Sequence, residues 1–217
     1  QLDAVEGTAA ILAVDPATGA SKVVFTEQAW KDESWLNLSY AFRTLDDGRI
    51  LWWSERDGFG HLYVWTPSKP AKSVLDAEKR GEVVTYNKGK FTQLTKGPWV
   101  VHGVVGVDKA KGVVYFTGNR ETPIEKQLYR VSLKGGAVEQ LTENGYWNEA
   151  VMDAGASRII VTRSNVNQPP QTYLADKNGK RLRWIEENVL DSSHPYAPYL
   201  ESHQPTTFGT ITAADGQ

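Results

Sequence analysis

Residues 51–65 read Leu-Trp-Trp-Ser-Glu-Arg-Asp-Gly-Phe-Gly-His-Leu-Tyr-Val-Trp. The first three and the last four residues of this stretch are aliphatic or aromatic side chains that favour a pleated sheet. Between them, Asp57-Gly58 and Gly60 supply residues that accept the positive φ angles of a tight turn. The stretch therefore predicts two antiparallel strands joined by a short hairpin loop.

The hairpin recurs along the chain, which indicates a repeat architecture. His61-Leu62-Tyr63, Gln127-Leu128-Tyr129 and Gln171-Thr172-Tyr173 hold the same place in three successive units. Gln93-Leu94-Thr95 likewise corresponds to Gln140-Leu141-Thr142. Once a polar insertion at residues 66–90 is removed, the repeat is about 45 residues long, which is typical of a four-stranded propeller blade.

The units predict an all-β fold, a β-propeller fragment of about three full blades plus half a blade. We expect the outer half of a blade over 1–28, a blade with the insertion 66–90 over 29–99, blades over 100–147 and 148–190, and a last propeller segment over 191–217. Within these, residues 35–45 suggest a strand and residues 74–79 a short helical turn.

The hydrophobic pattern favours a propeller over a β-sandwich. Residues 50–53 and 113–116 are continuous apolar runs, as expected of middle strands that are covered on both faces by neighbouring blades. Residues 100–107 alternate small and branched side chains, which suits an innermost strand close to the propeller axis.

Composition excludes several function classes. The 217 residues carry a net charge of −2, which gives no basic footprint for nucleic acid, and no apolar run is long enough to span a membrane. The chain has no Cys, which excludes disulfides, thiol catalysis and Cys-ligated zinc. No cofactor or metal site is expected.

Several motifs together resemble one enzyme family. Residues 53–58 with His61-Leu62-Tyr63, residues 94–99, Gly135-Gly136, residues 164–170 and the tail 205–216 are similar to the propeller domain of bacterial dipeptidyl peptidase IV-like enzymes, in the prolyl oligopeptidase family of serine peptidases. The resemblance covers roughly residues 30–217.

The resemblance implies an eight-bladed propeller that caps an α/β-hydrolase domain and comes from a periplasmic or exported protein. The chain is then expected to be the second half of that propeller, ending where the family crosses to the hydrolase domain. The whole enzyme would remove amino-terminal dipeptides with Pro or Ala in second place, and the propeller would gate and bind the peptide. Blade faces left exposed at each end of such an arc predict self-association.

No catalytic machinery is evident in the chain. A hydrolase of this class needs a Gly-x-Ser-x-Gly turn for its nucleophile, and the sequence has none; residues 155–159 begin like one, but Ser157 is followed by Arg158 and Ile159. The chain is therefore expected to be inactive alone. Glu186-Glu187 follows an outer strand, so the family's paired-Glu role in holding a peptide amino terminus is not transferred to it.

The candidate site residues are few. By its position, Trp35 corresponds to a loop from which the family offers an aromatic side chain to the substrate's second residue; inter-blade packing is the alternative. Glu55-Arg56-Asp57 suggests either a binding cluster or a structural hairpin network. The four His residues lack metal spacing, and only His102, on the predicted inner strand, could face a channel.

Two further functions stay open on the residues alone. The first is a stand-alone protein-binding propeller without enzymatic activity. The second is a propeller glycosidase, which requires two carboxylates at a defined separation. The inner strands offer Asp108, Glu149 and Asp153 without an evident pair, so this function is ranked last.

Overall fold

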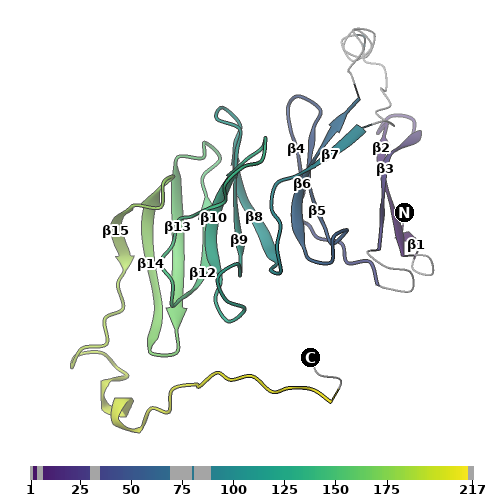
Figure 1. The fold of residues 1–217 in the computed structure, drawn as a ribbon. Coiled ribbons are helices and arrows are strands. Elements are labelled where there is room, and N and C mark those ends of the chain that lie inside the picture. The colour runs from purple at the N-terminus through teal and green to yellow at the C-terminus, as the bar shows by residue number, and fades with distance from the viewer. Residues whose placement is uncertain (1, 4–6, 30–34, 69–79, 81–88, 215–217) are drawn as a thin grey trace.

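The computed structural model describes residues 2–3, 7–29, 35–68, 80 and 89–214. These residues form one three-stranded and three four-stranded sheets that stack face to face in an open arc (Figure 1). Every strand pair within the four sheets is antiparallel. The prediction of an all-β chain built from four-stranded blades is confirmed.

Each sheet takes its strands in chain order. The first sheet contains β1 (Leu2–Asp3), β2 (Thr8–Val14) and β3 (Ser21–Gln28). The second contains β4 (Arg43–Thr44), β5 (Ile50–Ser54), β6 (His61–Pro67) and β7 (Gly89–Gln93). The third contains β8 (Val101–Asp108), β9 (Val113–Gly118), β10 (Gln127–Ser132) and β11 (Glu139–Gln140).

The fourth sheet contains β12 (Trp147–Met152), β13 (Arg158–Asn165), β14 (Gln168–Asp176) and β15 (Arg181–Glu186). A short 3₁₀ helix, η1 (Ala197–Ser202), follows and leads into an extended tail that runs back along the arc (Figure 1). Among the described residues, no helix has the length and apolar character needed to cross a membrane.

The structure differs from the sequence expectations in three segments. Residues 35–45 yield only the two-residue β4. Ser39 Oγ accepts a hydrogen bond from the nearby Ala41 N (3.0 Å) and Asn37 Nδ2 donates to Glu55 in the hairpin loop, so side-chain hydrogen bonds take the place of a strand ladder. The first sheet gains β1, and β7 begins inside the expected insertion. The expected helical turn at 74–79 lies outside the described residues.

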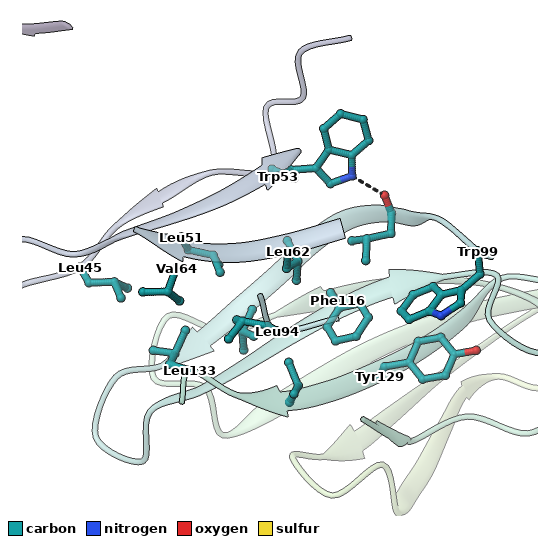
Figure 2. Packing of buried hydrophobic residues seen from close by; sticks show 14 residues of the cluster. Leu45, Leu51, Trp53, Leu62, Val64, Leu94, Trp99, Phe116, Tyr129 and Leu133 are labelled. Atoms are coloured by element: carbon teal, nitrogen blue, oxygen red, sulfur yellow. Dashed lines mark hydrogen bonds between the residues drawn. The ribbon is translucent and has the colours of Figure 1, made fainter. Parts of the chain in front are cut away.

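The main hydrophobic core lies between the second and third sheets (Figure 2). Leu51 and Leu62 of the second sheet and Val114 and Phe116 of the third are fully buried within it. Trp53 reaches across the interface and donates its indole N–H to the carbonyl oxygen of Val101 at 2.8 Å. The middle strands of these two sheets are buried on both faces, as the continuous apolar runs predicted.

The fourth sheet is covered on one face only. Ile159 and Val161 on β13 are buried against the third sheet, whereas Ile160 between them is 44% exposed and Val151 on β12 is 70% exposed. The first sheet has a similar outer face, where Leu12, Val14 and Val23 are exposed. Both ends of the arc therefore present apolar sheet faces.

Replacing Gly60 by Ala should destabilise the fold. An added Cβ would meet Trp53 Cζ2 at 2.2 Å, and that indole is fixed by its bond to Val101, so the clash must move packed atoms. We expect a loss of about 1–3 kcal/mol in the free energy of unfolding, measured by urea titration. Gly103→Ala is the control, because its Cβ meets nothing within 4 Å; equal effects for both variants would contradict the prediction.

Candidate functional site

The hairpin residues Glu55, Arg56 and Asp57 each have a different hydrogen-bonding partner elsewhere in the chain. Glu55 accepts a hydrogen bond from Asn37 Nδ2 at 2.8 Å, Asp57 accepts one from Gln93, and the Arg56 guanidinium bonds the carboxylate of Glu27 at 2.6 Å. Within the part of the chain that the structure describes, no three His, Cys, Asp or Glu residues gather into a metal site. This geometry favours the structural network over a binding cluster.

Glu27 is the centre of that network. It is 3% exposed, and besides Arg56 its carboxylate accepts hydrogen bonds from Trp52 Nε1 (2.7 Å) and Ser54 Oγ (2.9 Å). The Arg56 guanidinium also lies 3.7 Å from the ring centre of Phe91. Since Glu27 belongs to β3 and its donors to the second sheet and the loop after β5, one buried charge ties the first two sheets together.

Sequence reasoning missed Glu27, although a signal existed. On β3, Phe25 packs toward the second sheet, and Glu27 is two residues later on the same face. A strand period of two thus places a carboxylate among buried aromatic side chains. Such a carboxylate needs a charged partner, and Arg56 is the partner that the fold supplies.

His61 and Gln127 occupy the same repeat position, and each side chain hydrogen-bonds a threonine in the segment after the outer strand of its sheet. We call this arrangement the polar clasp. His61 Nδ1 lies 3.0 Å from Thr95 Oγ1 and His61 Nε2 lies 2.9 Å from the Gly97 carbonyl oxygen. In the next sheet, Gln127 Oε1 accepts from Thr142 Oγ1 at 2.7 Å, and Gln127 Nε2 donates to the carbonyl oxygen of Tyr146 at 3.2 Å.

The threonine completes the clasp in both sheets. Thr95 Oγ1 accepts from the backbone N–H of Leu62 at 3.0 Å, and Thr142 Oγ1 accepts from that of Leu128 at 2.9 Å. The third strand of each sheet is thereby bonded to the segment that follows its outer strand. The clasp explains why the repeat keeps a His or Gln and a Leu-Thr pair, and it assigns His61 to structure.

His102 belongs to a polar cluster where the first strands of the third and fourth sheets meet. The imidazole ring lies 5.8 Å from the Trp147 ring. Lys126 Nζ forms an ion pair with Glu149 and lies 4.8 Å from the Trp147 ring centre. The Lys126 side chain is 9% exposed, so the cluster holds a largely buried cation between an aromatic ring and a carboxylate.

The stability of the protein should fall on mild acidification because of His102. His102 is exposed to solvent but partly desolvated, which lowers its pKa, and the Lys126 charge lowers it further, against the opposing effect of Glu149. Between that lowered pKa and the unfolded value of about 6.5, the unfolded chain binds more protons, so stability rises with pH through this window and levels off above it.

The measurement is urea unfolding of the parent protein and the His102→Gln variant between about pH 5 and pH 7.5. The parent should lose more stability toward the acid end than the variant, in which the other histidines still titrate. Parallel pH profiles would contradict the prediction.

The three carboxylates considered for a glycosidase, Asp108, Glu149 and Asp153, each have a hydrogen-bond or ion-pair partner within the chain. Asp108 accepts from Lys111 N at 3.0 Å, and this backbone bond holds its pKa below its ordinary value. Asp153 accepts from Arg158 N at 2.5 Å and from Ser157 N at 2.7 Å, and these bonds lower its pKa in the same way. Glu149 is paired with Lys126. Two of the three thus cap turns and the third neutralises a lysine, so the arrangement gives no support to a carboxylate pair for glycoside hydrolysis.

Ser157 and the remaining histidines also have local partners. Ser157 Oγ donates to Asp153 Oδ2 at 3.2 Å within an exposed turn. His194 Nε2 lies 3.0 Å from Asn188 Oδ1, and His203 bonds Tyr196 OH and the Val166 carbonyl oxygen. These histidines fasten the segment after the fourth sheet.

Trp35 stands apart from all of these groups. It is 74% exposed in the segment that precedes β4, and residues 30–34 on its amino-terminal side lie outside the described residues. The indole is therefore available to a ligand at this surface. Whether it contacts one stays a prediction.

Comparisons with known proteins agree with this fold. Residues 5–170 match the family described as the dipeptidyl peptidase IV (DPP IV) N-terminal region. A probable dipeptidyl-aminopeptidase B of Emericella nidulans is 30% identical over 72% of this chain and 16% of its own length. Dipeptidyl peptidase 8 of Mus musculus is 28% identical over 82% of the chain and 22% of its own length.

A solved structure shows the same arrangement of strands. The crystal structure of Porphyromonas gingivalis dipeptidyl peptidase 4 superposes with a TM-score of 0.76 over 100% of this chain and 27% of that chain, at 22% identity. The chain thus spans about a quarter or less of the proteins it matches. Because the family match covers most of the described sheets, the chain belongs to the dipeptidyl peptidase IV N-terminal region family.

Proposed function

We propose that this chain is the non-catalytic propeller portion of a serine exopeptidase that removes amino-terminal dipeptides. The match of residues 5–170 to the DPP IV N-terminal region carries the proposal, since the named relatives are dipeptidyl peptidases. In the whole enzyme the propeller gates access and holds the peptide. A separate α/β-hydrolase domain supplies the Ser, His and Asp that cleave it.

The test begins with the coding sequence beyond residue 217. A Gly-x-Ser-x-Gly motif followed by Asp and then His supports the proposal, and the full-length protein should then cleave a chromogenic Ala-Pro or Gly-Pro amide while the 217-residue chain does not. A stop codon directly after residue 217 would contradict it. A stand-alone protein-binding propeller would then be the leading function.

Trp35 is proposed to contact the second residue of the bound peptide. Its 74% exposed ring offers an apolar surface for a Pro or Ala side chain. In the full-length enzyme, Trp35→Ala should raise KM about three- to tenfold with little change in kcat, because the contact is made equally in the ground and transition states. Tyr199→Ala, at an exposed aromatic of η1, is the control; unchanged KM in Trp35→Ala would rule the contact out.

The exposed sheet faces are proposed to bind further blades. Leu12, Val14 and Val23 on the first sheet and Val151 and Ile160 on the fourth are apolar and exposed, as stacked blades require. In the full-length enzyme other blades of the same chain would cover them. In the isolated chain, stacking of two copies through these faces is expected, and Ile160→Asp should weaken it.

A further inference from the structure

A polar cavity lies where the third and fourth sheets meet. It has a volume of about 390 Å³, and residues of both sheets form its wall. Arg163, Lys180 and Arg181 place three cations in this wall, and of the described residues that line it, Glu143 is the only anion. The excess of positive charge favours a negatively charged ligand.

Arg163 is the most firmly held of the three cations. Its side chain is 8% exposed, its Nε donates to Gln171 Oε1 at 3.1 Å, and its Nη1 donates to Glu143 Oε2 at 2.7 Å. The guanidinium carbon also lies 4.1 Å from the ring centre of Tyr146. Within the part of the chain that the structure describes, Nη2 has no hydrogen-bond acceptor. A guanidinium fixed through two of its nitrogens can bind an oxyanion through the third with little loss of side-chain entropy.

Arg181 is held by aromatic rings alone. Its guanidinium carbon lies 4.1 Å from the ring centre of Trp184 and 5.6 Å from that of Tyr173. The guanidinium carbon of Arg163 lies 5.4 and 5.7 Å from the same two ring centres, so one pair of rings contacts both cations. The Arg181 side chain has no hydrogen-bond or ion-pair partner among the described residues. An anion between the two guanidinium groups would relieve their mutual repulsion.

The turn between β14 and β15 fixes the place of Lys180 and Arg181. Gly179 in this turn has a φ of +83°, and a Cβ there would clash with the Leu141 carbonyl oxygen just after β11. Asp176 Oδ1 accepts a hydrogen bond from the backbone N–H of Lys180 at 3.0 Å. The turn is therefore packed directly against the third sheet, and a ligand in the cavity would contact residues of both sheets.

The junction of the first and second sheets shows how a similar guanidinium is satisfied. Arg56 lies 4.8 Å from the ring centre of Tyr63, which has the same repeat position as Tyr173, and it binds the buried carboxylate of Glu27. At the junction of the third and fourth sheets, the Glu143 side chain is 70% exposed and bonds only one of the two guanidinium groups. An external oxyanion can supply there what Glu27 supplies to the first junction.

We propose that this cavity binds a small oxyanion, a dicarboxylate or a phosphate, between Arg163 and Arg181. Arg163 Nη2 and the Arg181 guanidinium donate charge-assisted hydrogen bonds to it, and the exposed Lys180 adds a third positive charge. The bound anion stabilises the junction, because each of the two sheets provides part of the wall. This proposal does not depend on the peptidase function.

The test is isothermal titration calorimetry of the 217-residue chain with inorganic phosphate and, separately, with succinate, at constant ionic strength. One anion per chain should bind with a Kd of about 1 mM or below. Arg181→Gln should weaken this binding at least about tenfold, because it removes a charged donor whose side chain makes no hydrogen bond within the described residues. The anion that binds more tightly identifies the ligand as a phosphate or a carboxylate.

Two further variants distinguish a specific site from general charge attraction. Arg183→Gln removes an equal charge from the same strand, but Arg183 does not line the cavity, so the affinity should stay within about twofold of the parent value. Glu143→Gln removes the competing carboxylate and should tighten binding about three- to tenfold. Equal weakening in Arg181→Gln and Arg183→Gln would overturn the proposal. So would a chain that gives neither heat nor a higher unfolding midpoint with either anion at about 10 mM.

Discussion

The Glu27→Ala variant is expected to lose about 3–5 kcal/mol of its free energy of unfolding, because the substitution leaves Arg56 without its buried counter-ion. The Glu27 carboxylate is nearly fully buried and accepts from Trp52 Nε1, Ser54 Oγ and Arg56 Nη2. Its loss also unpairs the buried indole N–H. The measurement is equilibrium urea unfolding followed by tryptophan fluorescence and circular dichroism.

Two further variants make this result specific. Glu55→Ala, which removes an exposed carboxylate from the same hairpin, should change stability by no more than about 0.5 kcal/mol. In the double variant Glu27→Ala with Arg56→Met, the unpaired charge is gone, so part of the loss should be recovered. Additive effects of the two substitutions would show that the carboxylate and the guanidinium are not coupled.

His61→Ala is expected to destabilise the protein by about 3–5 kcal/mol, whereas His61→Gln should cost less than half as much. The alanine leaves a cavity and removes the two hydrogen bonds that His61 makes, so that Thr95 Oγ1 keeps only its bond from Leu62 N and the Gly97 carbonyl oxygen only its bond from Trp99 N. Glutamine can make the same two bonds, as Gln127 does in the third sheet with Thr142 and a following carbonyl.

The reciprocal exchange checks the clasp independently. Gln127→His should also lower the free energy of unfolding less than Gln127→Ala does. It should still lower it somewhat, because Gln127 Oε1 also accepts a hydrogen bond from Asn148 Nδ2. Unfolding midpoints in urea are compared for all four variants. If His61→Gln is as damaging as His61→Ala, the repeat position is held by ring packing against Trp99 and not by its hydrogen bonds.

Sequence periodicity predicted the sheets where both faces of a strand are buried. The runs at 50–53 and 113–116 form β5 and β9 because continuous apolar residues fit a strand between two blades. Residues 35–42 do not form a strand because Ser39 bonds the nearby Ala41 N–H and Asn37 bonds Glu55 in the hairpin loop, and hydrophobicity does not record this competition. The sequence predicted that both Gly58 and Gly60 take a positive φ, and Gly58 does, at 98°. Gly60 is needed for a different reason, because a Cβ at this position would clash with the Trp53 ring.

The polar groups were less predictable than the strands. Spacing in the sequence showed that His61 and Gln127 occupy one repeat position, but their partners became visible only in three dimensions. Glu27 and Arg56 are 29 residues apart and meet through the stacking of two sheets. Lys126, directly before β10, and Glu149 of β12 likewise meet where two sheets pack together. Contacts between blades depend on the stacking geometry, which a repeat pattern in one chain does not specify.

The order of the strands within each sheet has a consequence for how the protein is made. Every sheet is completed by a continuous stretch, the third by residues 101–140 and the fourth by residues 147–186. A growing chain can therefore finish one sheet before the next has left the ribosome, and each new sheet finds an already formed apolar face on which to settle. The sheets of such a protein can therefore form one after another from the amino-terminal end, and the sheet made last has one face exposed to solvent until the next sheet packs on it.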